Sequence, residues 1–101
     1  MHSRIDLQTV LEEILGSRNV YFQPPASVKM SYPAIIYSLK SFDNRFANNS
    51  IYKHMTAYEV IVIDKNPDSP FIDKMGGLQY CSFDRHYRAD NLNHYVFTLY
   101  F

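Results

Sequence analysis

The sequence predicts one α+β domain over residues 1–101, built around a mainly antiparallel or mixed sheet of about four to five strands. Three observations predict this class. An apolar period of three to four residues marks a helix near the N-terminus, β-branched and aromatic runs follow it, and short connections between those runs favour antiparallel pairing. The chain of 101 residues is long enough to bury one hydrophobic core.

The first predicted element is a helix from Ser3 to Leu15. Its apolar side chains recur at three- and four-residue spacing and therefore share one face: Leu7, Val10, Leu11 and Ile14. Ser3 and Asp6 fit a capping box at its start. Gly16 is suited to a left-handed exit. The pattern indicates an amphipathic helix that packs against the rest of the domain.

Short apolar runs predict the strands, at Asn19–Gln23, Ala34–Leu39, Met55–Asp64, Leu78–Tyr87 and Leu92–Phe101. The uninterrupted β-branched run Val60–Ile63 predicts a central strand that is covered on both faces. In the last strand, alternation places four side chains on one face: Tyr95, Phe97, Leu99 and Phe101.

Turn residues separate these strands. Pro24 and Pro25 end the first one, because proline cannot donate to a strand ladder. The segment Lys65–Pro70 is predicted to be a turn that becomes a helix start, with Asp68 or Ser69 as the cap and Pro70 as the first helical residue. The short helix continues over Phe71–Met75 and is stopped by Gly76 and Gly77. Asp90 and Asn91 predict a turn between the last two strands.

A long polar connection is predicted from Phe42 to His54, where there is no Gly or Pro. Connections of this length inside a small domain are usually functional. We therefore expect it to project from the domain and to contact a neighbouring subunit or partner. The residues expected to make that contact are Arg45, Phe46, Asn48, Asn49 and Tyr52.

Composition restricts the function classes. Ten basic and ten acidic residues cancel, so tight binding of nucleic acid through phosphates is not expected. The single cysteine excludes an internal disulfide, and no apolar run is long enough for a membrane span. Acidic residues interrupt the N-terminal apolar positions, unlike in a signal peptide. Nine Tyr and seven Phe indicate either protein contacts or half-exposed aromatic side chains on a sheet.

No catalytic, metal or cofactor motif is visible. His86 and His94 lie in neighbouring predicted strands and could approach each other, but a metal would also need Cys81 or Asp84. An acid–base group of Asp84, His86 and Asp90 lacks a nucleophile and an oxyanion site. We therefore expect a protein that is not an enzyme and has no cofactor, with Cys81 in the core and the charges securing the hairpin.

Five segments, taken in order after an amphipathic helix, resemble the small tail-terminator proteins of long-tailed bacteriophages, also called tail-completion or head-to-tail joining proteins. They are VYFQPP (20–25), YPAIIYSL (32–39), RFANNSIY (45–52), YEVIVIDKNPDS (58–69) and CSFDRHYRADNLNHYVFTLYF (81–101). The resemblance covers nearly the whole chain, and the ordered set carries it rather than any one motif.

The resemblance implies an α+β subunit of the phage neck, in the virion at the tail–head junction, assembled in the host bacterial cytoplasm. Subunits, six by analogy with the family, would close into a homo-oligomeric ring on the tail tube. The ring would end tube polymerisation and bind the head-completion or connector protein, while DNA passes through its lumen. The implied partners are thus further copies of the chain, the tail tube protein and the connector, with no membrane and no catalytic residues.

A closed ring needs two different patches on each subunit. One is expected to include the Phe42–His54 connection. The other is expected at the helix beginning near Ser3 or at the strand end near His86 and Arg88.

Two alternatives remain at this stage. One is another neck component, such as a head-completion or tube-like protein, which would differ in the partner it binds. The other is a non-viral α+β domain for ligand binding or protein interaction, which would be monomeric or dimeric and would contain a formed pocket.

Overall fold

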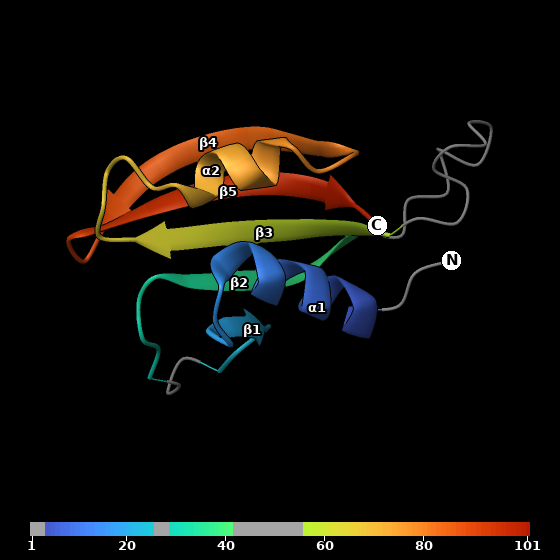
Figure 1. Ribbon diagram of the computed structural model, residues 1–101, viewed down its shortest axis with the longest axis horizontal. Coiled ribbons are helices and arrows are strands. Elements are labelled where there is room, and N and C mark those ends of the chain that lie inside the picture. Colours follow the sequence, from blue (N-terminus) through green and yellow to red (C-terminus); the bar gives the residue numbers. More distant parts are fainter. Residues whose placement is uncertain (1–3, 26–28, 42–55) are drawn as a thin grey trace.

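The computed structural model describes residues 4–25, 29–41 and 56–101. Along the chain the elements are α1 (Arg4–Leu15), β1 (Val20–Phe22), β2 (Ala34–Ser41), β3 (Ala57–Asp64), α2 (Phe71–Gly76), β4 (Cys81–Ala89) and β5 (Leu92–Tyr100). They form the predicted α+β domain with one five-stranded mixed sheet (Figure 1). The predicted connection Phe42–His54, with its contact residues Arg45, Phe46, Asn48, Asn49 and Tyr52, lies outside the described residues.

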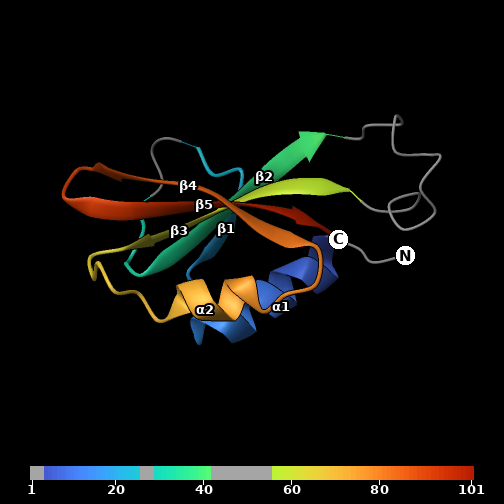
Figure 2. The same cartoon turned by 90° about the horizontal axis from the view of Figure 1, so that it is seen from above.

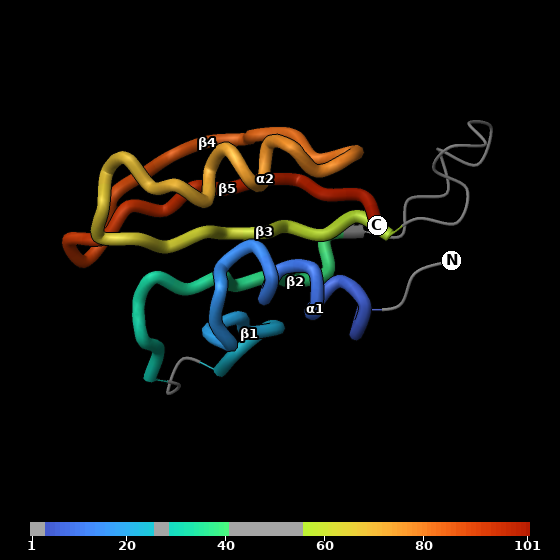
Figure 3. Tube along the Cα trace, viewed as in Figure 1, coloured from blue at the N-terminus to red at the C-terminus, as the bar shows by residue number. Residues whose placement is uncertain are grey.

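The strand order in the sheet is β1-β2-β3-β5-β4. β1 runs parallel to β2, and the pairs β2–β3, β3–β5 and β5–β4 are antiparallel. The predicted central position of the strand that contains Val60–Ile63 is confirmed, because β3 is the middle strand. β1 and β4 are the two outermost strands (Figure 3).

Both helices lie on the same face of the sheet (Figure 2). α1 contacts β1 and β2, and α2 contacts β4, so each helix covers one half of the sheet. The helices also contact each other. We call the face beneath them the helix face and the opposite one the open face.

The core lies between the helices and the helix face. α1 contributes Leu7, Leu11 and Leu15, so the predicted apolar stripe is confirmed at its two most buried positions, Leu7 and Leu11. The sheet contributes one residue of β1 and alternate residues of β2, β3 and β5: Val20, Ile35, Tyr37, Tyr58, Val60, Val62, Tyr95, Phe97 and Leu99. The predicted shared face of Tyr95, Phe97 and Leu99 is thereby confirmed, and Phe101 packs against the same cluster.

The prediction that both faces of β3 are covered is confirmed only in part, because on the open face Ala57 and Ile63 are buried whereas Ile61 is partly exposed. Val60 and Val62 are fully buried beneath the helices, but no described helix covers the open face, and Ile61 is partly exposed there. Ile61 stands in a row with Ile36 on β2 and Val96 on β5. The run Val60–Ile63 is therefore apolar throughout because its helix-face residues are buried in the core and its open-face residues are partly covered.

Three boundaries depend on backbone conformation. Gly16 has φ 77°, which confirms the predicted left-handed exit from α1. Asp90 and Asn91 have φ 55° and 62°, as a two-residue hairpin turn requires, so the predicted turn is confirmed. β4 begins at Cys81, three residues after the predicted Leu78, because Tyr80 adopts φ 62° and interrupts the extended chain.

The start of α2 differs from the prediction. Pro70 occupies the N-cap position and has no side-chain cap, whereas it was expected as the first helical residue after Asp68 or Ser69. The turn before it is organised by side chains instead. Asp64 Oδ1 accepts from the Asn66 N–H at 3.0 Å, and Asn66 Oδ1 accepts from the Asp68 N–H at 2.9 Å.

Two adjacent isoleucines on β2 provide a matched test of the two faces. Ile35 is fully buried on the helix face, whereas Ile36 is partly exposed on the open face. We expect Ile35→Ala to lower the free energy of unfolding by about 2–5 kcal/mol and Ile36→Ala by about 1 kcal/mol. Urea denaturation followed by circular dichroism measures both. Equal losses would contradict a core confined to the helix face.

Amide hydrogen exchange tests the central strand. We expect the amides of Val60–Ile63 to exchange most slowly in the domain, because β2 and β5 both pair with this stretch and it opens only when the sheet does. The amides of Ser17 and Arg18, in the exposed turn between α1 and β1, are the internal reference for fast exchange. Exchange of Val60–Ile63 at the rate of that turn would show the assignment to be wrong.

Candidate interaction surface on the outer strand

β4 is the most exposed strand of the sheet. Within the described residues it pairs only with β5, and every residue after Cys81 is exposed. Two large apolar side chains are among them: Phe83 is 54% exposed and Tyr87 is 38% exposed. Exposed aromatic residues along an unpaired edge are typical of contact surfaces.

His86 is held in place by the neighbouring strand. Its Nε2 lies 3.1 Å from Asn93 Oδ1, and its ring stacks on Tyr95 with 4.8 Å between the ring centres. Asn93 Nδ2 donates to the carbonyls of Asp64 and Lys65, so its Oδ1 is the acceptor and His86 Nε2 is the donor. The hairpin is thereby tied to the β3–α2 turn.

The structure places both predicted β4 residues on one face. The register pairs His86 with Tyr95 and Arg88 with Asn93. Because side chains two residues apart on a strand share a face, His86 and Arg88 both lie on the helix face. Both are exposed. Their role in an interface stays a prediction.

The approach of His86 to His94 that the neighbouring strands allowed does not occur. Tyr87, not His86, pairs with His94, so the two histidines point to opposite faces of the hairpin. His94 stacks on Tyr87 with ring centres 4.7 Å apart, and its Nδ1 donates to the Leu92 carbonyl at 3.2 Å. No group of three or more potential metal ligands occurs in the described segments.

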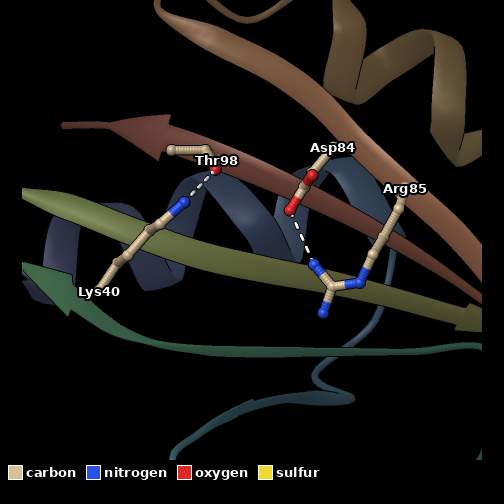
Figure 4. Close-up of polar contacts among 4 residues, drawn as sticks. All are labelled: Lys40, Asp84, Arg85 and Thr98. Atoms are coloured by element: carbon tan, nitrogen blue, oxygen red, sulfur yellow. Dashed lines mark hydrogen bonds and ion pairs between the residues drawn. The ribbon is translucent and has the colours of Figure 1, made fainter.

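The three residues weighed as an acid–base group have separate partners. Asp84 forms a salt bridge with Arg85 at 2.8 Å on the exposed surface (Figure 4). His86 bonds to Asn93, and Asp90 lies in the hairpin turn. Within the described residues no hydrogen bond or ion pair joins any two of the three. The Asp84–Arg85 pair lies at the β4 bulge and not at the Asp90–Asn91 turn, so the prediction that these charges secure the hairpin is not confirmed.

The open face carries charges of both signs between its apolar rows. Lys40 on β2 reaches across β3, and its Nζ donates to Thr98 Oγ1 on β5 at 2.9 Å (Figure 4). Arg85 lies over the ring of Tyr87, 5.9 Å from its centre. These long side chains lay their methylene stems on the sheet while keeping their charges in water.

Sequence reasoning missed Asn93 and Tyr95 as the residues that position His86. The signal was present in the two-residue turn at Asp90 and Asn91. A two-residue hairpin fixes the register on both sides, which places residue 86 opposite residue 95 and residue 87 opposite residue 94.

Cys81 is half-buried at the start of β4 and packs against the core, where it was predicted to lie. Burial raises the pKa of its thiol to about 11. The reactive thiolate is therefore scarce near neutral pH, which suits a packing role better than a chemical one.

We expect Cys81 to be alkylated slowly in the folded protein. At pH 8 a pKa of about 11 instead of the ordinary 9.0 lowers the thiolate fraction about 100-fold relative to the unfolded chain. Iodoacetamide labelling followed by mass spectrometry, with and without urea, measures this ratio. Because the folded pKa is the higher one, stability should also fall as pH rises from about 9 to about 11. A native labelling midpoint near the ordinary thiol value would contradict the assignment.

Comparisons with known proteins assign no family: no family model, no curated protein and no solved structure matches the chain. Among the described helices, none is both long and apolar enough to cross a membrane.

Proposed function

We propose that this protein is a structural component of a phage neck: a subunit of a homo-oligomeric ring that caps the tail tube. The ring ends tube polymerisation and joins the tail to the head. Its partners are further copies of the chain, the tail tube protein and the connector protein of the head. Its location is the tail–head junction of the virion.

The observation that carries this proposal is the correspondence between the family-like segments and the sheet. VYFQPP contains β1, YPAIIYSL supplies most of β2, YEVIVIDKNPDS supplies β3 with its following turn, and the last segment is the β4–β5 hairpin. Four of the five segments are thus strands and turns of one continuous sheet, and the fifth, RFANNSIY, lies outside the described residues. The α+β fold is also the one that the resemblance implies.

The surface of the subunit supports a contact function. A ring subunit needs separate patches for its two neighbours. β4 offers one exposed strand with His86 and Arg88 on it, and α1 presents Ile5, which is 68% exposed. These features lie at opposite sides of the sheet, since α1 covers the β1–β2 half.

The balanced charge fits passage of DNA through a ring. A lumen that strongly attracted phosphates would retain the genome, because such attraction grows with every basic contact. Ten basic and ten acidic residues leave no net attraction over the whole chain.

Deleting the gene from its virus is the test of this function. We expect filled heads and separate tails, with tails that are abnormally long or unable to join. Electron microscopy of the lysate shows both particles, and restoring the gene in trans is the control. Normal infectious particles, or a defect limited to DNA replication or lysis, would reject the proposal.

Native mass spectrometry of the protein with and without tail tube protein complements this experiment. A ring that forms only on the tube end is compatible with the proposal, because binding to a template stabilises an assembly that is weak alone.

A further inference from the structure

The two edges of the sheet are built differently. β1 is three residues long and is followed by Pro24 and Pro25. Its Val20 carbonyl already accepts a hydrogen bond from Gln8 Nε2 of α1 at 3.0 Å. β4 is nine residues long and contains neither Lys nor Pro, although its three charged residues and its bulge limit the strands that can pair with it. Of the two edges, only β4 is suited to accept another strand along its length.

The hairpin determines which groups of β4 face outward. The pair that closes a two-residue hairpin, Ala89 with Leu92, exchanges hydrogen bonds, and bonded pairs alternate with non-bonded ones. At the end of the hairpin away from the turn, the Tyr100 N–H donates to the Tyr80 carbonyl at 3.1 Å. This bonded pair fits the same alternation of bonded and non-bonded pairs on the other side of the bulge. The N–H and C=O groups of Phe83, His86 and Arg88 therefore point away from β5.

A bulge restricts the partner. The register shifts between Phe83 and Arg85, so two residues of β4, Asp84 and Arg85, stand opposite Val96. The β4 strand of a second copy, running antiparallel, can accommodate this bulge when His86 of one copy lies opposite His86 of the other. Asp84 and Arg85 of each copy then lie together opposite the single residue Tyr87 of the other copy. The bulges of the two strands are thus placed symmetrically about His86.

We propose that β4 is a self-association edge, on which the β4 strand of a second copy pairs antiparallel about a two-fold axis through His86. Two five-stranded sheets would thus join into one.

The side chains agree with this register on both faces. On the open face, Arg85 meets Tyr87 of the second copy, repeating the cation–aromatic contact that it makes within its own chain. On the helix face, Arg88 meets the ring of Phe83 of the second copy, a side chain that is exposed in the single chain. Each Arg85 is neutralised by its own Asp84 at 2.8 Å, so the two copies do not repel each other there.

The pairing does not rest on the proposed function, because it follows from the edge of the sheet alone. It concerns the free protein, in which a two-fold contact closes on itself and gives a dimer. A ring on the tube end would use a heterologous contact, which the experiments below distinguish.

Cysteine cross-linking tests the axis directly. In a Cys81→Ser background, His86→Cys places two thiols on opposed residues whose Cα atoms are about 5.5 Å apart in a bonded pair, within disulfide range. Arg88→Cys is the matched control on the same strand and face, but its two copies would be about 13 Å apart. We expect mild oxidation to give covalent dimer with His86→Cys only. Equal cross-linking of both variants, or none with His86→Cys, overturns the pairing.

Backbone substitution tests the hydrogen bonds. His86→Pro removes an N–H that points to the partner and not to β5, whereas His86→Ala keeps it. Sedimentation equilibrium should show dimers for the wild type and His86→Ala, and a dissociation constant raised about tenfold or more for His86→Pro. If His86→Pro does not fold, as judged by circular dichroism, the cross-linking result decides.

The masses of the assemblies in solution distinguish the β4 pairing from the proposed neck function. A concentration-independent monomer, or a ring without the His86→Cys cross-link, overturns the β4 pairing, and the ring would still favour the neck function. A cross-linked dimer supports the pairing whatever the gene deletion shows.

Discussion

The side-chain amide of Gln8 is the contact on which the arrangement of helix, sheet and edges depends. Its Oε1 accepts from the hydroxyl of Tyr37, a fully buried side chain on β2, and its Nε2 donates to the Val20 carbonyl on β1. A buried hydroxyl without a partner would cost folding free energy, so α1 must lie where Gln8 can reach it. The same amide closes the β1 edge. Together with the buried leucines, this residue positions α1 over the β1–β2 half of the sheet and closes the β1 edge.

Covering only one face of the sheet has consequences for the other. Val96 is fully buried on the open face, and Ile63 is 4% exposed there, although no described helix lies over them. Side chains of the sheet itself provide cover, since Lys40 crosses β3 to Thr98 and His94 stacks on Tyr87. A sheet face shielded in this way stays polar at its surface while keeping β-branched residues beneath. Contacts of the open face with other proteins would first have to displace these charged side chains.

Most of the fold could be predicted from local patterns, because each pattern reports one physical requirement. The leucine spacing of α1, the alternation in β5 and the Asp90–Asn91 turn all hold in the structure. Coverage of β3 could not be predicted, since an apolar run does not say what lies above it. Strand order was equally hidden: β1 pairs parallel with β2, and no residue in either strand encodes that direction.

The candidate surface was predictable in part. His86 and Arg88 were chosen because charged residues gather near the hairpin, and both are exposed on β4. Counting residues back from the two-residue turn places His86 and Arg88 on one face and separates His86 from His94. The composition of the strand alone does not give this register. The difference between the two edges was predictable in part: the prolines after β1 are visible in the sequence, whereas the hydrogen bond from Gln8 to the Val20 carbonyl, twelve residues away, is not. Long-range side-chain contacts of this kind determine which edge of a small sheet is free to associate, and here they direct association toward β4.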